Sequence, residues 1–168
     1  MKGTLLKIWD HFEEFFLIPS LMVSVALVFI QVIMRYVFSN SLTWSEELAR
    51  YLYVWQTWIG VSYSARNGTH LRITMLRDRL PQKGQQILEL FVTIVWVIFG
   101  IFMIVMGMRT VATITAYGQT SAALMIPMQF CYVSIPIGMF LMCIRLVERT
   151  VKNFMANRSK AVEGGKAE

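Results

Sequence analysis

The chain has 168 residues, of which 56% are hydrophobic, and a formal net charge of +6. An apolar fraction this large is hard to bury inside a soluble domain of this size, which argues against a soluble protein. An excess of basic over acidic residues can indicate nucleic-acid binding, but here the Lys and Arg residues flank hydrophobic stretches. That placement favours contact with anionic lipid headgroups over contact with nucleic acid.

Four hydrophobic stretches are candidates for membrane spans, because about 20 apolar residues cross roughly 30 Å of hydrocarbon. Three are long enough, whereas the uncharged part of the second, residues 51–65, falls short. Residues 157–168 are polar and are expected to form a disordered tail. We place one membrane domain at residues 1–156, with spans at roughly 16–38, 46–65, 87–109 and 123–146.

The positive charge is distributed unevenly between the two sides of these spans. Most of the 16 Lys and Arg residues lie before the first span, in the loop from Arg66 to Glu89, or after Arg145. The loops 36–45 and 110–121 contain none. Loops rich in Lys and Arg stay in the cytoplasm. The sequence therefore predicts an all-α integral membrane protein with four transmembrane helices and both termini cytoplasmic.

Local signals refine the helices in chain order. Residues 1–14 carry apolar side chains at helical spacing, which predicts an amphipathic interfacial helix that continues into the first span near Pro19. Thr43–Glu46 has the spacing of a capping box and predicts a helix that begins there. A second short interfacial helix is expected between residues 70 and 80. Pro136, near the middle of the fourth span, predicts a kink.

Charged residues gather at the outer end of the first two predicted spans. Because the second span is short, the turn that carries Glu46, Glu47 and Arg50 must lie in the outer interface, where unpaired charges are costly. Arg50 can pair with either acid within the helix, which leaves Arg35 of the first span for the other. Two interpretations stay open: a clasp that holds the helical hairpin, or a docking patch for another protein. The candidate clasp comprises Arg35, Trp44, Glu46, Glu47 and Arg50.

Aromatic residues form a stripe along the second helix. Trp44, Leu48, Tyr51, Trp55 and Trp58 recur at the spacing of a single helix face. A stripe that runs to the middle of the membrane packs on another helix or on lipid. We predict a seam with a partner subunit at Tyr51, Trp55 and Trp58, with lipid exposure as the alternative.

Residues that catalysis or independent transport would require are missing from the spans. No Asp or Glu lies deep inside a span, although ion-driven carriers usually need a buried acid or broken helices. His11 and His70 lie outside the spans, and Cys131 and Cys143 are too far apart along one helix to form a disulfide. We therefore expect no enzymatic activity, no metal site and no cofactor in this chain.

Two connected motifs resemble a known family. Residues 31–38 (QVIMRYVF) and 44–50 (WSEELAR), with 118–127 (GQTSAALMIP) later on, are similar to the small membrane subunit of tripartite ATP-independent periplasmic (TRAP) transporters, the DctQ-like family. The resemblance covers roughly residues 1–150. The pairing R-Y-x-F…W-S-E-E-x-A-R is its specific part, and the rest is ordinary membrane sequence.

The resemblance implies a four-helix protein of the bacterial inner membrane with several partners. In such systems a periplasmic binding protein captures an organic-acid anion, such as a sialic acid or a C4-dicarboxylate. A large membrane subunit then carries the anion inward with sodium ions, which are expected in that subunit. The small subunit would support the large one within the lipid membrane and help to dock the binding protein.

Two other functions are considered for a small four-helix membrane protein. A self-sufficient exporter, akin to small multidrug transporters, would need an acidic residue in the middle of the first span, and none is present. A membrane-anchored assembly protein would call for His or Cys ligands. Both alternatives are therefore weaker than the interpretation as a transporter subunit.

Overall fold

The computed structural model describes residues 2–40, 42–67 and 82–164, and in these ranges regular structure is almost wholly helical. The helices are α1 (Lys2–Tyr36), α2 (Thr43–Asn67), α4 (Gln82–Ala116), α5 (Gln129–Tyr132) and α6 (Ser134–Gly164). Within these ranges, three segments are long and apolar enough to cross a membrane: His11–Tyr36, Ile87–Ala116 and Gln129–Asn153. The prediction of an all-α membrane protein is therefore confirmed.

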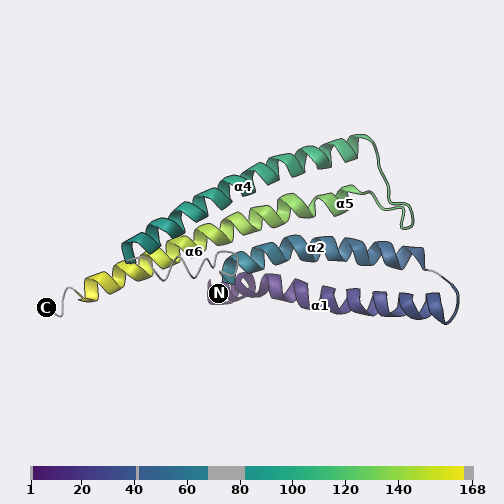
Figure 1. Ribbon diagram of the computed structural model, residues 1–168, viewed down its shortest axis with the longest axis horizontal. Coiled ribbons are helices and arrows are strands. Elements are labelled where there is room, and N and C mark those ends of the chain that lie inside the picture. Colours follow the sequence, from purple (N-terminus) through teal and green to yellow (C-terminus); the bar gives the residue numbers. More distant parts are fainter. Residues whose placement is uncertain (1, 41, 68–81, 165–168) are drawn as a thin grey trace.

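The long helices lie side by side in a row, in the order α1, α2, α6, α4 (Figure 1). α2 and α6 run in one direction, and α1 and α4 run in the other (Figure 1). The start of α1 and the end of α6 lie at one end of the row, here called the terminal end (Figure 1). The opposite end carries residues 37–42 and 117–128 and is called the loop end (Figure 1).

Small residues allow the middle helices of the row to approach closely. Gly138 of α6 lies against α2, where an added Cβ atom would be 2.5 Å from the carbonyl oxygen of Trp58. Gly107 of α4 lies against Pro136, where an added Cβ would be 3.1 Å from the ring. The buried apolar cluster lies beside these contacts and comprises Ala65, Met139, Met142 and Leu146. The core of the protein is therefore the α2–α6–α4 interface.

The first two helices begin and continue as the sequence predicts. α1 is one continuous helix, so the predicted N-terminal helix continues into the first span, with Pro19 inside it. Membrane helices tolerate an internal proline, because neighbouring groups can satisfy the carbonyl that loses its donor. α2 begins at Thr43, as the capping-box spacing predicts. There the Ser45 hydroxyl donates to the Leu42 carbonyl at 2.8 Å.

The last helix begins later and ends later than the sequence suggests. Residues 117–128 form a loop, so the fourth helical segment starts at Gln129 instead of residue 123. The interruption expected from Pro136 falls at Val133, between α5 and α6, because the proline has no N–H to donate to the Tyr132 carbonyl.

The predictions for the polar segments have different outcomes. α6 continues to Gly164, so residues 157–164 are helical and the prediction of a disordered tail is wrong for them. The helix persists because nothing in this stretch breaks it before the paired glycines that begin at Gly164. The interfacial helix expected at residues 70–80 lies outside the described residues.

Candidate functional sites at the two ends of the row

At the loop end, Glu47 connects two segments that are far apart in the sequence. One of its carboxylate oxygens accepts a hydrogen bond from the Tyr51 hydroxyl at 2.8 Å. The other accepts from the backbone N–H groups of Ala123 and Leu124, at 2.8 and 3.0 Å. Hydrogen bonds to a charged acceptor are roughly twice as strong as neutral ones. Glu47 therefore fastens the 117–128 loop to the start of α2.

The 117–128 loop is also folded on itself. The Ser121 N–H donates to the Ile126 carbonyl at 2.9 Å, and residues 120 and 127 form an isolated antiparallel bridge. The loop needs two residues in the left-handed region, Gly118 at φ +57° and Met125 at φ +55°. Glycine adopts this conformation without strain, whereas methionine adopts it at a cost. The internal bonds and the Glu47 contact together offset that cost.

The remaining members of the candidate clasp are arranged differently from the prediction. Arg50 pairs with Glu46 at 3.3 Å, as the spacing allows, and both side chains are more than half exposed. In the described part of the chain Arg35 makes no ion pair, and its guanidinium lies 6.0 Å from the Tyr36 ring centroid. The expected pairing of Arg35 with the second acid is therefore wrong, because Glu47 is already satisfied by the loop amides.

Replacing Glu47 by glutamine should loosen the loop and leave the helices intact. The amide side chain keeps its size but loses the charge that strengthens the bonds to Ala123 and Leu124. Hydrogen bonds to charged groups contribute about 1.5–3 kcal/mol, so these two amides should exchange with deuterium at least tenfold faster. Glu46→Gln is the matched control and should leave the exchange unchanged. Equal exchange in all three proteins would contradict the assignment.

The aromatic stripe makes several contacts within the chain. The Trp55 indole N–H donates to the Phe130 carbonyl at 3.1 Å, and the ring lies 6.4 Å from that of Phe16. Trp58 packs against the buried cluster of α2 and α6, and Tyr51 donates to Glu47. All three are half-buried. The structure therefore gives the predicted seam residues partners inside this chain.

At the terminal end, a buried ion pair joins the first and last long helices. The Arg145 guanidinium donates to both carboxylate oxygens of Glu13, from Nε at 2.7 Å and from Nη2 at 2.9 Å. The side chains of Glu13 and Arg145 are only 1% and 3% exposed. The Ser62 hydroxyl of α2 donates to the same carboxylate at 3.2 Å. One carboxylate thus connects α1, α2 and α6.

Further charges surround this pair. Arg66, near the end of α2, lies 3.7 Å from carboxylate oxygens of both Glu13 and Glu14. Glu148 pairs with Arg145 at 3.3 Å and with Lys152 at 2.7 Å. The sequence does not indicate this network, because each of these residues resembles a separate charge at the membrane boundary. One signal in the sequence could have revealed the pair. Glu13 precedes the first span and Arg145 lies at the end of the fourth, so both are predicted to lie at the same depth in the membrane.

These features define a multi-pass membrane protein whose charged side chains hold its helices in fixed positions. The sequence profile of the family described as "Tripartite ATP-independent periplasmic transporters, DctQ component" matches residues 24–155. The chain therefore belongs to the DctQ family of small TRAP transporter permease subunits, as the resemblance predicts. It is a protein of the bacterial inner membrane and a transporter component, not an enzyme.

Curated relatives carry the same kind of description. The ectoine TRAP transporter small permease protein TeaB of Halomonas elongata is 25% identical, over 90% of this chain and 78% of its own length. The sialic acid TRAP transporter small permease protein SiaQ of Vibrio cholerae is 28% identical, over 85% of this chain and 82% of its own. The isethionate TRAP transporter permease protein DctMQ of Oleidesulfovibrio alaskensis is 25% identical over 82% of this chain, which spans only 23% of that relative.

Proposed function

We propose that this chain is the scaffold subunit of a sodium-driven TRAP transporter that imports an organic-acid anion. The main support for this proposal is that polar side chains of its membrane helices form hydrogen bonds with one another. Besides the Glu13–Arg145 pair, Gln56 of α2 donates to the Ser24 hydroxyl of α1 at 2.8 Å. The hydroxyls of Thr93 and Thr150 meet at 3.0 Å. Such groups hold helices together and are not free to bind a substrate or an ion.

Two partners follow from this role: a large membrane subunit and a periplasmic substrate-binding protein. The matched family is one component of a tripartite system. In the DctMQ relative, the matched region is a minor part of one longer permease chain, which supports direct association with a large subunit. The substrate would be an organic acid, such as a sialic acid or a C4-dicarboxylate; relatives are named for these two, and others for ectoine and isethionate.

The exposed side chains indicate which surfaces contact the two partners. α1 and α4 form the two edges of the row, and each carries large exposed apolar side chains that suit either lipid or a large subunit. At the loop end, the exposed Glu46–Arg50 pair and Trp44 lie on α2, and the side chains of Tyr117 and Met125 are about three-quarters exposed. We assign the large subunit to an edge of the row and the binding protein to the loop end.

We place the loop end in the periplasm and the terminal end in the cytoplasm, with α2 as a fourth membrane-crossing helix. Its 25 residues extend for about 37 Å, and it lies between α1 and α6. Reporter fusions after Asn40 and Gly118 should be active only as periplasmic reporters, and fusions after Gly84 and Gly164 only as cytoplasmic ones. A periplasmic signal at Gly84 would overturn this orientation.

Reconstitution into liposomes tests the proposed role. The chain alone should give no sodium-dependent uptake of sialic acid or of a C4-dicarboxylate. Uptake should appear when the large subunit and the binding protein are both added, and omission of this chain should abolish it. Uptake by the chain alone would overturn the scaffold assignment and favour an exporter-like carrier.

A further inference from the structure

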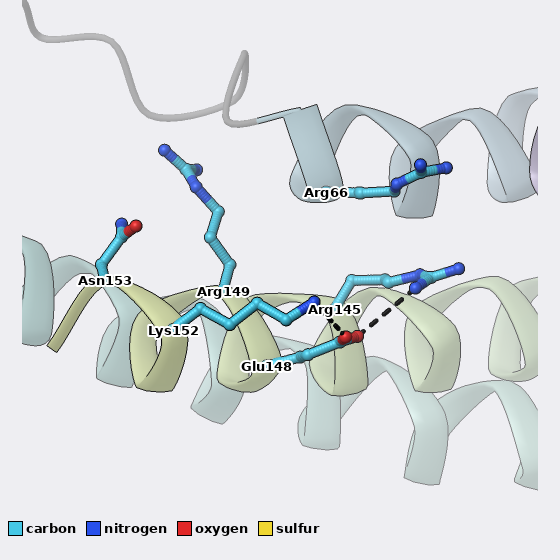
Figure 2. A pocket seen from close by; sticks show the side chains of 6 residues that line it. All are labelled: Arg66, Arg145, Glu148, Arg149, Lys152 and Asn153. Atoms are coloured by element: carbon cyan, nitrogen blue, oxygen red, sulfur yellow. Dashed lines mark hydrogen bonds and ion pairs between the residues drawn. The ribbon is translucent and has the colours of Figure 1, made fainter. Parts of the chain in front are cut away.

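A basic hollow lies at the terminal end, where α6 continues beyond the end of α2. Its volume is about 270 Å³. Figure 2 shows Arg149 rising from α6 toward the end of α2, and Lys152 lying along α6 toward Glu148. The hollow is lined by Arg66, Arg145, Glu148, Arg149, Lys152 and Asn153. Four cationic side chains and one acid thus surround a space that can admit a small anionic group.

Among the described residues, three of the four cations pair with carboxylates, whereas Arg149 does not. Glu13 receives two hydrogen bonds from Arg145, and Glu148 receives one from Lys152 at 2.7 Å. Within the described ranges Arg149 makes no hydrogen bond and no ion pair, although its side chain is only partly exposed. A guanidinium presents a planar set of N–H donors that matches carboxylate and phosphate oxygens. Arg149 is therefore the group best placed to take an external anion.

Arg66 adds a second incompletely satisfied donor. Its Nη1 atom is buried and makes no hydrogen bond in the described part of the chain. The carboxylates of Glu13 and Glu14 lie 3.7 Å away, within reach for electrostatic attraction but too far for a hydrogen bond. Nη1 therefore faces the carboxylates of α1, and Arg66 adds its positive charge to the hollow that it lines.

The position of the hollow matches the depth of a lipid headgroup. The candidate membrane span of the last helices ends at Asn153, one of the lining residues. A second, apolar hollow of about 400 Å³ lies on α6 beside it, lined by Cys143, Ile144 and Val147, with Glu148 shared between the two. A basic site at the membrane boundary next to an apolar surface can hold both parts of an amphiphile.

We propose that Arg149, in the hollow that it lines with Arg66, Arg145 and Lys152, binds the phosphate group of an anionic phospholipid. The headgroup occupies the basic hollow, and an acyl chain lies along the apolar surface of α6. The Glu13–Arg145 and Glu148–Lys152 pairs shape the hollow and leave the N–H donors of Arg149 available to the phosphate. Basic pockets between membrane helices are known to select anionic headgroups in this way. The site does not depend on the transport role proposed above.

Lipid titration of the purified full chain tests the site. Phosphatidylglycerol and phosphatidylcholine would be added to the protein in detergent, and the bound lipid counted by native mass spectrometry. We expect a preference of about fivefold or more for phosphatidylglycerol, since one basic residue near the membrane surface contributes about that factor. Inorganic phosphate at millimolar concentration should not displace the lipid. Full displacement by phosphate would assign the site to a free anion and overturn the lipid proposal.

Substitutions then locate the binding. Arg149→Gln should weaken phosphatidylglycerol binding about fivefold without lowering the melting temperature, because Arg149 has no partner among the described residues. Arg149→Lys keeps the charge and should retain most of the binding even if the glutamine variant folds poorly. Arg50→Gln, at the loop end, is the matched control and should bind like the wild type. Equal binding by wild type and Arg149→Gln, or an equal loss in Arg50→Gln, would overturn the proposal.

Discussion

Replacing Glu13 by glutamine should lower the free energy of unfolding by about 3–5 kcal/mol, the largest effect expected for a single charge change in this chain. The substitution leaves Arg145, which is 3% exposed, without the carboxylate that accepts two of its hydrogen bonds. Arg145 keeps its ion pair with Glu148 at 3.3 Å, but losing one partner from a buried pair costs far more than the intact pair stabilises. Thermal unfolding of the purified chain in detergent would measure the loss.

Two further variants distinguish the loss of the buried Glu13–Arg145 pair from a general effect of removing a charge. Arg50→Gln removes a cation from the exposed pair with Glu46, and exposed pairs contribute only about 0.2–1 kcal/mol. The double variant Glu13→Gln with Arg145→Met also removes the buried cation that has lost Glu13, and it should regain much of the lost stability, because apolar replacements of buried pairs are often neutral. If Glu13→Gln unfolds at the same temperature as Arg50→Gln, the buried pair does not stabilise the helix row.

Replacing Gly138 by alanine should destabilise the contact between α2 and α6 by about 1–3 kcal/mol, the usual cost of overpacking a tight interface. The added Cβ would lie 2.5 Å from the Trp58 carbonyl oxygen and 2.7 Å from the carbonyl carbon. These are backbone atoms, so the clash cannot be relieved by rotating a side chain. The helices must separate, which also disturbs the neighbouring buried cluster.

A second glycine provides the control for this prediction. Gly60 also lies inside a helix, but an added Cβ there would meet nothing within 4 Å. Gly60→Ala should be neutral or stabilising by up to about 1 kcal/mol, because alanine loses less conformational entropy in a helix than glycine. Melting temperatures of the two variants should therefore differ clearly and in this order. A Gly138→Ala protein as stable as Gly60→Ala would mean that the two helices do not approach so closely.

The sequence by itself determined the class of the protein and most of its helices. Hydropathy is a sum over consecutive residues, so the three apolar segments were visible without knowledge of their neighbours. The start of α2 was also predictable, because its signal lies within Thr43–Glu46. The motif that joins Arg35 to Glu46 and Glu47 indicated the family before any contact was known.

The sequence was a poorer guide where a boundary depends on contacts between segments. The 117–128 loop contains apolar residues that read as the start of the fourth span, yet its backbone bonds to itself and to Glu47. Similarly, the aromatic stripe has the correct helical period, but periodicity says only that Trp55 and Trp58 share a face. It does not say which helix they face.

Only the tertiary structure decided which charged groups meet. Glu13 and Arg145 are separated by most of the chain, and each resembles an ordinary charge at a membrane boundary until α1, α2 and α6 are placed side by side. Glu47 likewise has an apparent partner in Arg35 and a true one in the backbone of the 117–128 loop. Pairing depends on distances between helices, and those distances are set by close packing at residues such as Gly138, which no local pattern encodes.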